Sequence, residues 1–301
     1  MVKKSLFVFA VTFLVFLIRP VLASDVEFPL VQSFSYFPYV KNEMLPPGAQ
    51  DLFLDLGYSN IYMFTVDGEI INDFDTFTAT VGYRRPVLKN LVAEFYLRMG
   101  VLYGGGLDRT IEDFHKIIGI KDDGRDQLPR NTVHFRYRDI FQYNSAQSLT
   151  GPFIAGILTR IHHGRDVDLN FRASLGIPLN EKIGISSGKP FLTTGLSALF
   201  RKNGLALDIS CYASFFKPPE WAEAENVRSR MFFFNVHGAY KKIWGGFLFR
   251  STPFRDTDLS NPAYQIYIGY RISDHISISM VEEIPPMDTV TDVTFRLLLE
   301  F

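Results

Sequence analysis

Apolar residues occupy every second position at the carboxyl end of the chain, from Val293 to Phe301, and mostly polar residues stand between them. Successive side chains of a β-strand point to opposite faces, so this segment has one apolar and one largely polar face. The same alternation recurs over 91–103, 167–177, 205–215 and 264–272. The polar faces carry full charges, which the dry core of a soluble sandwich would not accept unpaired. The pattern therefore predicts a membrane β-barrel with a polar lumen.

The first residues of the chain are typical of a secretion signal. Lys3 and Lys4 precede an apolar run over 6–18, and Ala23 supplies a small residue at a position suited to cleavage. We expect residues 1–23 to be a signal peptide, with an uncleaved membrane anchor as the alternative. No later segment holds the roughly 18 consecutive apolar residues of a transmembrane helix. An exported chain of this kind is either a periplasmic protein or a barrel.

The charge balance excludes one class of partner. Removing residues 1–23 takes away three of the 31 basic residues and none of the 32 acidic ones, which leaves 28 against 32 and a formal net charge of −4. A chain with this balance lacks the basic surface of a nucleic-acid-binding protein. Cys211 is the single cysteine, so the exported protein must be stable without an internal disulfide.

Short and long polar connections alternate between the expected strands. Short ones lie near 84–90, 162–166, 201–204, 241–244 and 273–275, and long ones over 104–151, 180–190, 217–229 and 252–262. Outer-membrane barrels have short periplasmic turns, long outer loops and an even number of strands. These conditions hold only if His134–Tyr143 is not counted as a spanning strand.

The remaining strands are expected over 51–65, 71–85, 91–103, 152–162, 166–178, 191–201, 204–216, 230–241, 244–253, 263–272, 275–284 and 291–301. We therefore predict an all-β fold. It consists of one antiparallel up-and-down transmembrane barrel of about twelve strands (roughly 10 to 14) over residues 51–301.

Residues 104–150 do not resemble barrel wall. Asp108 is a suitable helix cap, the apolar residues after it recur at three- and four-residue spacing, and Gly119 ends the run. Residues 134–143 are expected to form a small hairpin above the membrane. The sequence thus predicts a long extracellular loop over 104–150 that contains one short helix.

The same loop carries a family resemblance. Its distinctive residues are Gly104, Ile111-Glu112-Asp113-Phe114-His115, Gly119, Asp123-Gly124-Arg125-Asp126 and Pro129-Arg130-Asn131. Similar residues outside the loop are Phe28-Pro29-Leu30-Val31, Leu45-Pro46-Pro47-Gly48 and Asp67-Gly68-Glu69. In these features the chain resembles the DUF3187 family, proteobacterial proteins of unknown function that are thought to be outer-membrane barrels. The resemblance implies this fold and the outer membrane of a Gram-negative bacterium, but no activity and no catalytic residue.

Residues 24–50, between the signal peptide and the first strand, are rich in aromatic side chains. These are Phe28, Phe34, Tyr36, Phe37 and Tyr39. Such a composition argues against a free tail. The segment is expected either to lie on the periplasmic side or to run inside the barrel.

Charged residues are the candidates for a functional site. We select Arg98, Asp168 and Arg172 on predicted lumen faces, and Asp122 and Arg125 in the long loop. Lumen charges can orient or select a solute, or they can form salt bridges that merely fill a narrow barrel. The acidic turn around Asp122 lacks the alternate ligand spacing of a calcium loop. We therefore expect no metal site and no cofactor.

The pattern favours a porin-like pore or binding protein for the passage of a small polar or amphipathic solute through the outer membrane. The first alternative is a membrane-embedded hydrolase acting on lipid or envelope substrate, but no Ser and His stand at a spacing that marks a catalytic pair. We assign no catalytic residue. The second alternative is a structural or partner-binding barrel without transport. The expected partners are outer-membrane lipid and lipopolysaccharide, the unknown solute, and the barrel-assembly machinery, which would engage the strand that ends at Phe301.

Overall fold

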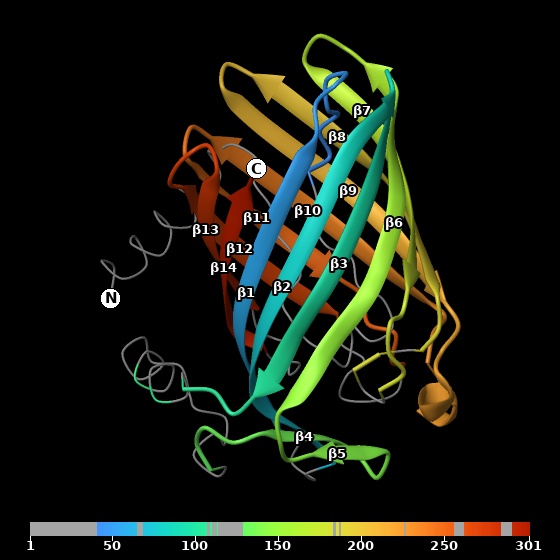
Figure 1. Ribbon diagram of the computed structural model, residues 1–301, viewed down its shortest axis with the longest axis vertical. Helices are drawn as coiled ribbons and strands as arrows, with labels where there is room; N and C mark the ends of the chain where they lie inside the picture. The colour runs from blue at the N-terminus through green and yellow to red at the C-terminus, as the bar shows by residue number, and fades with distance from the viewer. Residues whose placement is uncertain are drawn as a thin grey trace, which may run out of the picture.

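Twelve strands close into a barrel (Figure 1). The computed structural model of the protein describes residues 41–64, 69–106, 109, 113, 129–182, 185–186, 188–225, 227–255, 262–283 and 291–301. Fourteen strands form one sheet, and the pairing of β1 with β2 joins its two sides and leaves β4 and β5 outside the ring. The prediction of an all-β antiparallel barrel of about twelve strands is confirmed.

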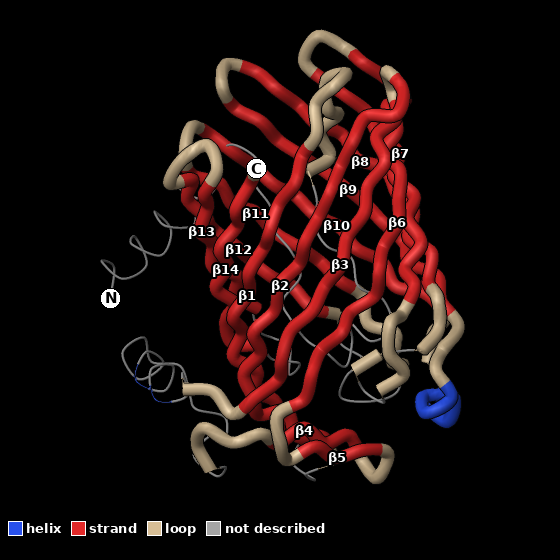
Figure 2. The backbone as a smooth tube through the Cα atoms, viewed as in Figure 1, coloured by secondary structure: helices blue, strands red, loops and turns tan. Residues whose placement is uncertain are grey.

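The barrel strands follow one another around the wall almost in chain order. They are β1 (Asp51–Phe64), β2 (Ile70–Leu88), β3 (Leu91–Tyr103), β6 (Gln147–His163), β7 (Val167–Ile177), β8 (Phe191–Lys202), β9 (Leu205–Phe216), β10 (Arg230–Tyr240), β11 (Ile243–Arg250), β12 (Ala263–Arg271), β13 (Ile276–Glu283) and β14 (Thr291–Glu300). The turns β2–β3, β6–β7, β8–β9, β10–β11 and β12–β13 lie at one end, here named the short-turn end. Figure 2 shows a wall built of strand between this end and the opposite, long-loop end.

The hairpin outside the ring is the one predicted over 134–143. β4 (His134–Tyr137) and β5 (Phe141–Tyr143) pair with each other, and β4 also pairs with the start of β2 at Ile70–Asp73. A short 3-10 helix, η2 (Glu220–Glu225), lies in the connection predicted to be a loop over 217–229. Within the described ranges, no helix is long and apolar enough to cross a membrane.

Two strands extend beyond their predicted bounds into predicted connections, and a proline lies at each site. β2 continues to Leu88, past the end predicted at 85 and into the short connection predicted over 84–90, and its pairing with β3 shifts register after Pro86. β6 begins at Gln147, inside the expected loop 104–150, and a register shift opposite Arg98 absorbs Pro152. Proline has no N–H to donate between strands, so a polar stretch that contains proline resembles a loop in the sequence. Here a β-bulge accommodates each proline within its strand.

The two faces of the wall differ in chemistry. Along β9, Leu205, Cys211 and Phe215 are exposed on the outer face, whereas Asp208 and Ser214 are buried on the lumen face. Large apolar side chains are exposed around the whole outer surface, among them Phe77, Ile157, Leu196, Ile268 and Phe295. A soluble barrel has the opposite arrangement, because its apolar side chains would be withdrawn from water.

Five aromatic side chains of the lumen lie flat against glycines on neighbouring strands. The directly paired residues are Phe53 with Gly82, Phe191 with Gly176, Tyr212 with Gly195, Tyr267 with Gly246, and Trp244 with Gly269. A Cβ atom at any of these glycines would overlap the ring. The missing side chain on one strand therefore lets the ring cover the wall instead of projecting across the lumen.

The barrel closes at a polar seam. The Arg296 guanidinium on β14 donates to both carboxylate oxygens of Asp55 on β1, with 3.2 Å between Nε and Oδ1. Farther along the same two strands, the Ser59 and Thr294 hydroxyls lie 2.8 Å apart. All four side chains are buried in the lumen.

Candidate functional site

A buried cluster of charged side chains lies in the lumen at the short-turn end. The Glu94 carboxylate on β3 accepts from Arg84 Nε on β2 at 3.0 Å and from Arg172 Nη2 on β7 at 3.1 Å, and Arg172 Nε lies 2.9 Å from Glu94 Oε2 as an ion pair. Arg84 Nη1 also lies 3.1 Å from Asp51 Oδ2. Two guanidinium groups thus face two carboxylates, so the cluster is internally neutral. Bidentate and shared contacts of this kind offset the cost of removing the charges from water.

The same wall binds the backbone of the chain segment that precedes β1. Three successive carbonyl oxygens of Lys41–Glu43 each accept a hydrogen bond from a lumen side chain. Arg172 Nη2 donates to the first at 3.1 Å, Asn170 Nδ2 to the second at 2.8 Å, and Arg84 Nη2 to the third at 2.7 Å. Side chains of the barrel therefore satisfy carbonyl groups that have no ladder partner.

The Asn42 side chain is held at both ends of its amide. Its Nδ2 donates to Asp208 Oδ2 at 2.8 Å, and its Oδ1 accepts from the Tyr212 hydroxyl at 2.6 Å. Asp208 and Tyr212 both lie on β9 and both are buried. The amide orientation follows from these partners, because only the NH₂ group can donate to the carboxylate. We name Arg84, Asn170, Arg172, Asp208 and Tyr212 the cradle.

Flanking side chains of the segment reach the rim of the barrel. Lys41 Nζ contacts the Glu300 carboxylate on β14 and lies 4.0 Å from Asp51. Burial lowers the pKa of Lys41, and the Asp51 carboxylate partly opposes that effect. On the other side, Glu43 Oε1 accepts from Arg201 Nη2 on β8 at 2.8 Å.

These contacts extend across the lumen. β1 and β14 adjoin each other on one side of the ring, and β8 and β9 lie on the opposite side. Lys41 touches the first side, Asn42 and Glu43 touch the second, and Met44 packs with Val92 and Leu158 on the wall between. The segment Lys41–Met44 therefore bridges facing walls and occupies the short-turn end of the lumen.

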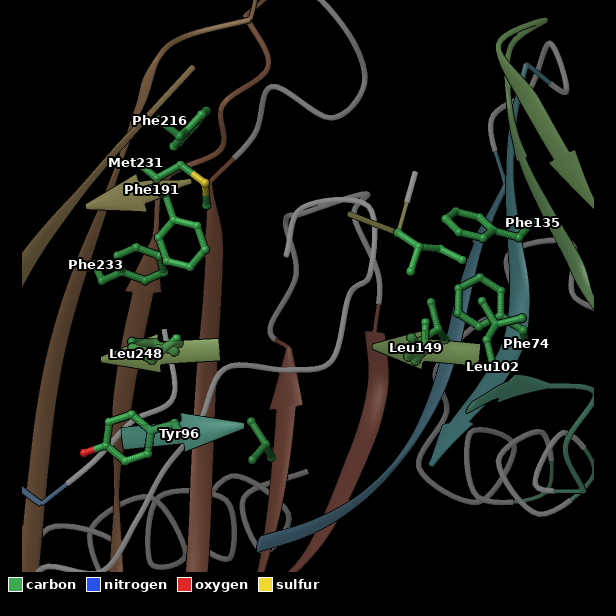
Figure 3. Packing of buried hydrophobic residues seen from close by; sticks show 14 of the residues in the cluster. Phe74, Tyr96, Leu102, Phe135, Leu149, Phe191, Phe216, Met231, Phe233 and Leu248 are labelled. Carbon is green, nitrogen blue, oxygen red and sulfur yellow. The ribbon is translucent and has the colours of Figure 1, made fainter. Parts of the chain in front are cut away.

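The long-loop half of the lumen has a different lining. Its buried side chains, here named the apolar layer, are Phe74, Leu102, Phe135, Leu149, Phe191, Phe216, Met231, Phe233 and Leu248. Figure 3 shows them in two groups that face each other, one on β2, β3, β4 and β6 and the other on β8 to β11. The Phe135 ring lies 5.0 Å from Phe74 and 4.9 Å from Phe141, centroid to centroid. Aromatic packing therefore links the hairpin to the wall.

The structure places the predicted site residues in three groups. Arg172 is part of the cradle, and Asp168 lies at the rim, where Arg201 Nη1 donates to it at 2.9 Å. Arg98 is buried on the lumen face of β3, but it takes part in none of the contacts to Lys41–Met44 described above. Asp122 and Arg125 lie outside the described residues. So does the predicted helix from 108 to 119, apart from residues 109 and 113, and it stays a prediction.

Four cradle residues were missed from the sequence. Arg84 lies where the predicted strand 71–85 overlaps the predicted connection 84–90, and Asn170 and Tyr212 are uncharged residues of predicted polar faces. Asp208 lies on the polar face of the alternation over 205–215 but is not among the five selected charges. The polar face of each strand was the available signal, but it does not show which polar residues meet one another. Among the described residues, no group of three or more His, Cys, Asp or Glu side chains is placed to hold a metal ion.

Comparison with solved structures shows a shared barrel fold. The backbone is similar to that of the COG4313 outer membrane channel from Pseudomonas putida F1, with a TM-score of 0.55 and 11% identity over 87% of this chain and 98% of that chain. Salmonella typhi OmpF in complex with daunomycin aligns over 84% of this chain and 97% of that chain at 8% identity, but its TM-score of 0.34 supports no argument. No curated protein matches the sequence.

Sequence similarity identifies the family. The family described as DUF3187, protein of unknown function, matches residues 22–198, which is more than half of the chain. The chain therefore belongs to the DUF3187 family, as the residues of its long loop predicted.

Proposed function

We propose that this protein is an outer-membrane channel for a small polar or amphipathic solute, and that Lys41–Met44 close it in the described conformation. The observation that carries the proposal is the bridge from β1 and β14 to β8 and β9 across the short-turn end. A barrel wall that served only as a scaffold would not need buried side chains directed at a segment inside its lumen. The segment blocks the path, and its polar contacts can be exchanged for contacts with water or solute.

Several features support a position in the outer membrane of a Gram-negative bacterium. The outer face is apolar where a soluble barrel would be polar. The last barrel strand is followed by the aromatic residue Phe301, and this strand would serve recognition by the barrel-assembly machinery. Outer-membrane lipid and lipopolysaccharide would then surround the wall. In this orientation the short-turn end faces the periplasm, so the closed end is the exit for an incoming solute.

The two halves of the lumen support the class of solute. A molecule that enters at the long-loop end meets the apolar layer first and the ionic groups around Glu94 afterwards. A purely ionic solute gains little from contact with the apolar layer. A purely apolar solute would displace water from the charged groups of the short-turn half without offering them hydrogen-bond partners. An amphipathic solute matches both.

Single-channel conductance in a planar bilayer tests the proposal. Asn42→Asp places a carboxylate against Asp208 and removes the donor that holds the segment, so the open state should be populated more often than in the wild type. Asn90→Asp makes the same chemical change at an exposed turn of the same end and should leave the single-channel current the same as in the wild type. A wild type that is fully open, or an Asn42→Asp variant as silent as the wild type, would contradict the proposal. Silence from both would favour a barrel without transport.

A further inference from the structure

The chemistry that the cradle recognises is that of a peptide. Arg172, Asn170 and Arg84 donate to three successive main-chain carbonyls, a pattern that any short peptide can present. Asp208 and Tyr212 accept from and donate to one side-chain amide. Together the five side chains recognise a main chain of three residues with a carboxamide side chain in the middle.

We propose that the cradle is a binding site for short peptides with a central carboxamide residue, and that Lys41–Glu43 fill this site in cis. A peptide of the same chemistry competes with the segment for the same five side chains. The proposal deepens the proposed function, because a competing peptide would displace the segment that closes the channel. The binding site itself rests only on the contacts described above.

The cradle is organised independently of the segment that fills it. Arg84 uses Nε and Nη1 for Glu94 and Asp51, which leaves Nη2 to hold a carbonyl. Arg172 is paired with Glu94 through Nε and Nη2, and Nη2 also donates to the carbonyl. The two arginines are therefore fixed and neutralised by acids of the wall itself. When the segment leaves, the donors stay in place on rigid strands, as a preformed binding site requires.

The pair Asp208 and Tyr212 selects the central residue. Aspartate in place of asparagine would set two carboxylates against each other, and leucine would remove the donor to the Asp208 carboxylate and the acceptor for the Tyr212 hydroxyl. Loss of these two hydrogen bonds discriminates more strongly than loss of apolar contact, because the buried carboxylate and hydroxyl cannot replace them with bonds to water. The site therefore prefers a carboxamide over both an acid and an aliphatic side chain.

Occupation in cis sets the condition for seeing a peptide bind. A tethered segment acts at an effective concentration on the order of millimolar, so a free peptide competes poorly with it in the wild type. The full chain carrying Asn42→Asp has the segment weakened and the cradle intact. This variant is the receptor for the test.

The experiment measures fluorescence anisotropy of a labelled peptide with the sequence of residues 39–46, added to the refolded full-length variant in detergent. We expect this peptide to bind the Asn42→Asp barrel at least about tenfold more tightly than the wild-type barrel, where the site is filled. We also expect at least about tenfold weaker binding of a control peptide with Asp at the position of Asn42. Adding Tyr212→Phe to the receptor should reduce this preference.

Equal affinity of the two peptides, or equal binding by the wild-type and Asn42→Asp barrels, would overturn the peptide site. Heat-dependent gel migration verifies that each variant is folded, and Asn42→Ala replaces Asn42→Asp if the latter does not fold. The readout does not depend on conduction. A barrel that binds the peptide but never conducts would refute the proposed channel and leave the peptide site standing.

Discussion

The two halves of the lumen are built on different principles. The short-turn half holds paired charges and a chain segment fixed by hydrogen bonds, whereas the long-loop half is packed with aromatic and aliphatic side chains. Hydrogen bonds can be exchanged for others with water or ligand at little net cost, but apolar packing can be opened only by exposing its surface. The short-turn half is therefore suited to reversible rearrangement and the long-loop half to stability.

The largest effect is expected in the short-turn half, from Glu94→Ala. Removal of this carboxylate leaves Arg84 and Arg172 buried together without their shared partner, which should cost about 4 kcal/mol of unfolding free energy. The measurement is denaturant unfolding in lipid vesicles. Glu220→Ala, at an exposed carboxylate of η2, is the control and should change little. Similar losses for both variants would mean that the charge cluster does not stabilise the barrel.

A somewhat smaller loss is expected in the long-loop half, from Leu102→Ala. This side chain is fully buried in the apolar layer, and its truncation should cost about 3 kcal/mol in the same unfolding measurement. The fraction of time that the channel spends closed should be the same as in the wild type, because Lys41–Met44 at the other end are untouched. A variant that opened the channel as Asn42→Asp does would remove the distinction between the two halves.

Gly195→Ala tests whether the packing of Tyr212 against the wall is needed to keep Lys41–Met44 in the closed position. The new methyl group overlaps the Tyr212 ring and the Cys211 carbonyl, so it must move the hydroxyl that holds Asn42. We expect a loss of roughly 1–3 kcal/mol together with more frequent opening. Gly106→Ala adds a methyl group to open space and serves as the control. An unaffected closed state would show that Tyr212 is not needed to hold the segment.

The smallest effect is expected at the rim, from Arg201→Ala. Its side chain is 41% exposed although it contacts both Asp168 and Glu43. Exposed ion pairs contribute at most about 1 kcal/mol and are screened by salt. The stability difference from the wild type should therefore be small and should shrink as sodium chloride is added. A large, salt-independent loss would place Arg201 among the residues that hold the segment.

The barrel wall could be predicted because its pattern is local. The alternation along 205–215 assigns each side chain to a face without knowledge of any other strand, and the outer and lumen faces of β9 follow it. The end of β2 was misplaced because Arg84-Arg85-Pro86 has the composition of a turn, although the strand continues through it as a bulge. Local composition is least informative where a proline lies within a strand.

The cradle could not be predicted because it depends on closure of the ring. Asn42 meets Asp208 and Asn170 across 166 and 128 residues of chain. Which polar residues share one level of the lumen depends on the register of every strand between them. Arg172 was selected for its charge alone. Asn170, two residues away on the same face, also donates a hydrogen bond to the segment, but without a charge it does not stand out from the other polar lumen residues.

The most direct test of closure measures how fast a membrane-impermeant thiol reagent reacts at residue 44. Met44→Cys and Asn90→Cys are compared in a Cys211→Ser background, because Cys211 is exposed. Met44 is buried against Val92 and Leu158. Its cysteine should react at least about tenfold more slowly than the one at Asn90, and adding Asn42→Asp should speed it up, because reaction requires the segment to open. Equal rates at the two positions would show that Lys41–Met44 do not close the short-turn end.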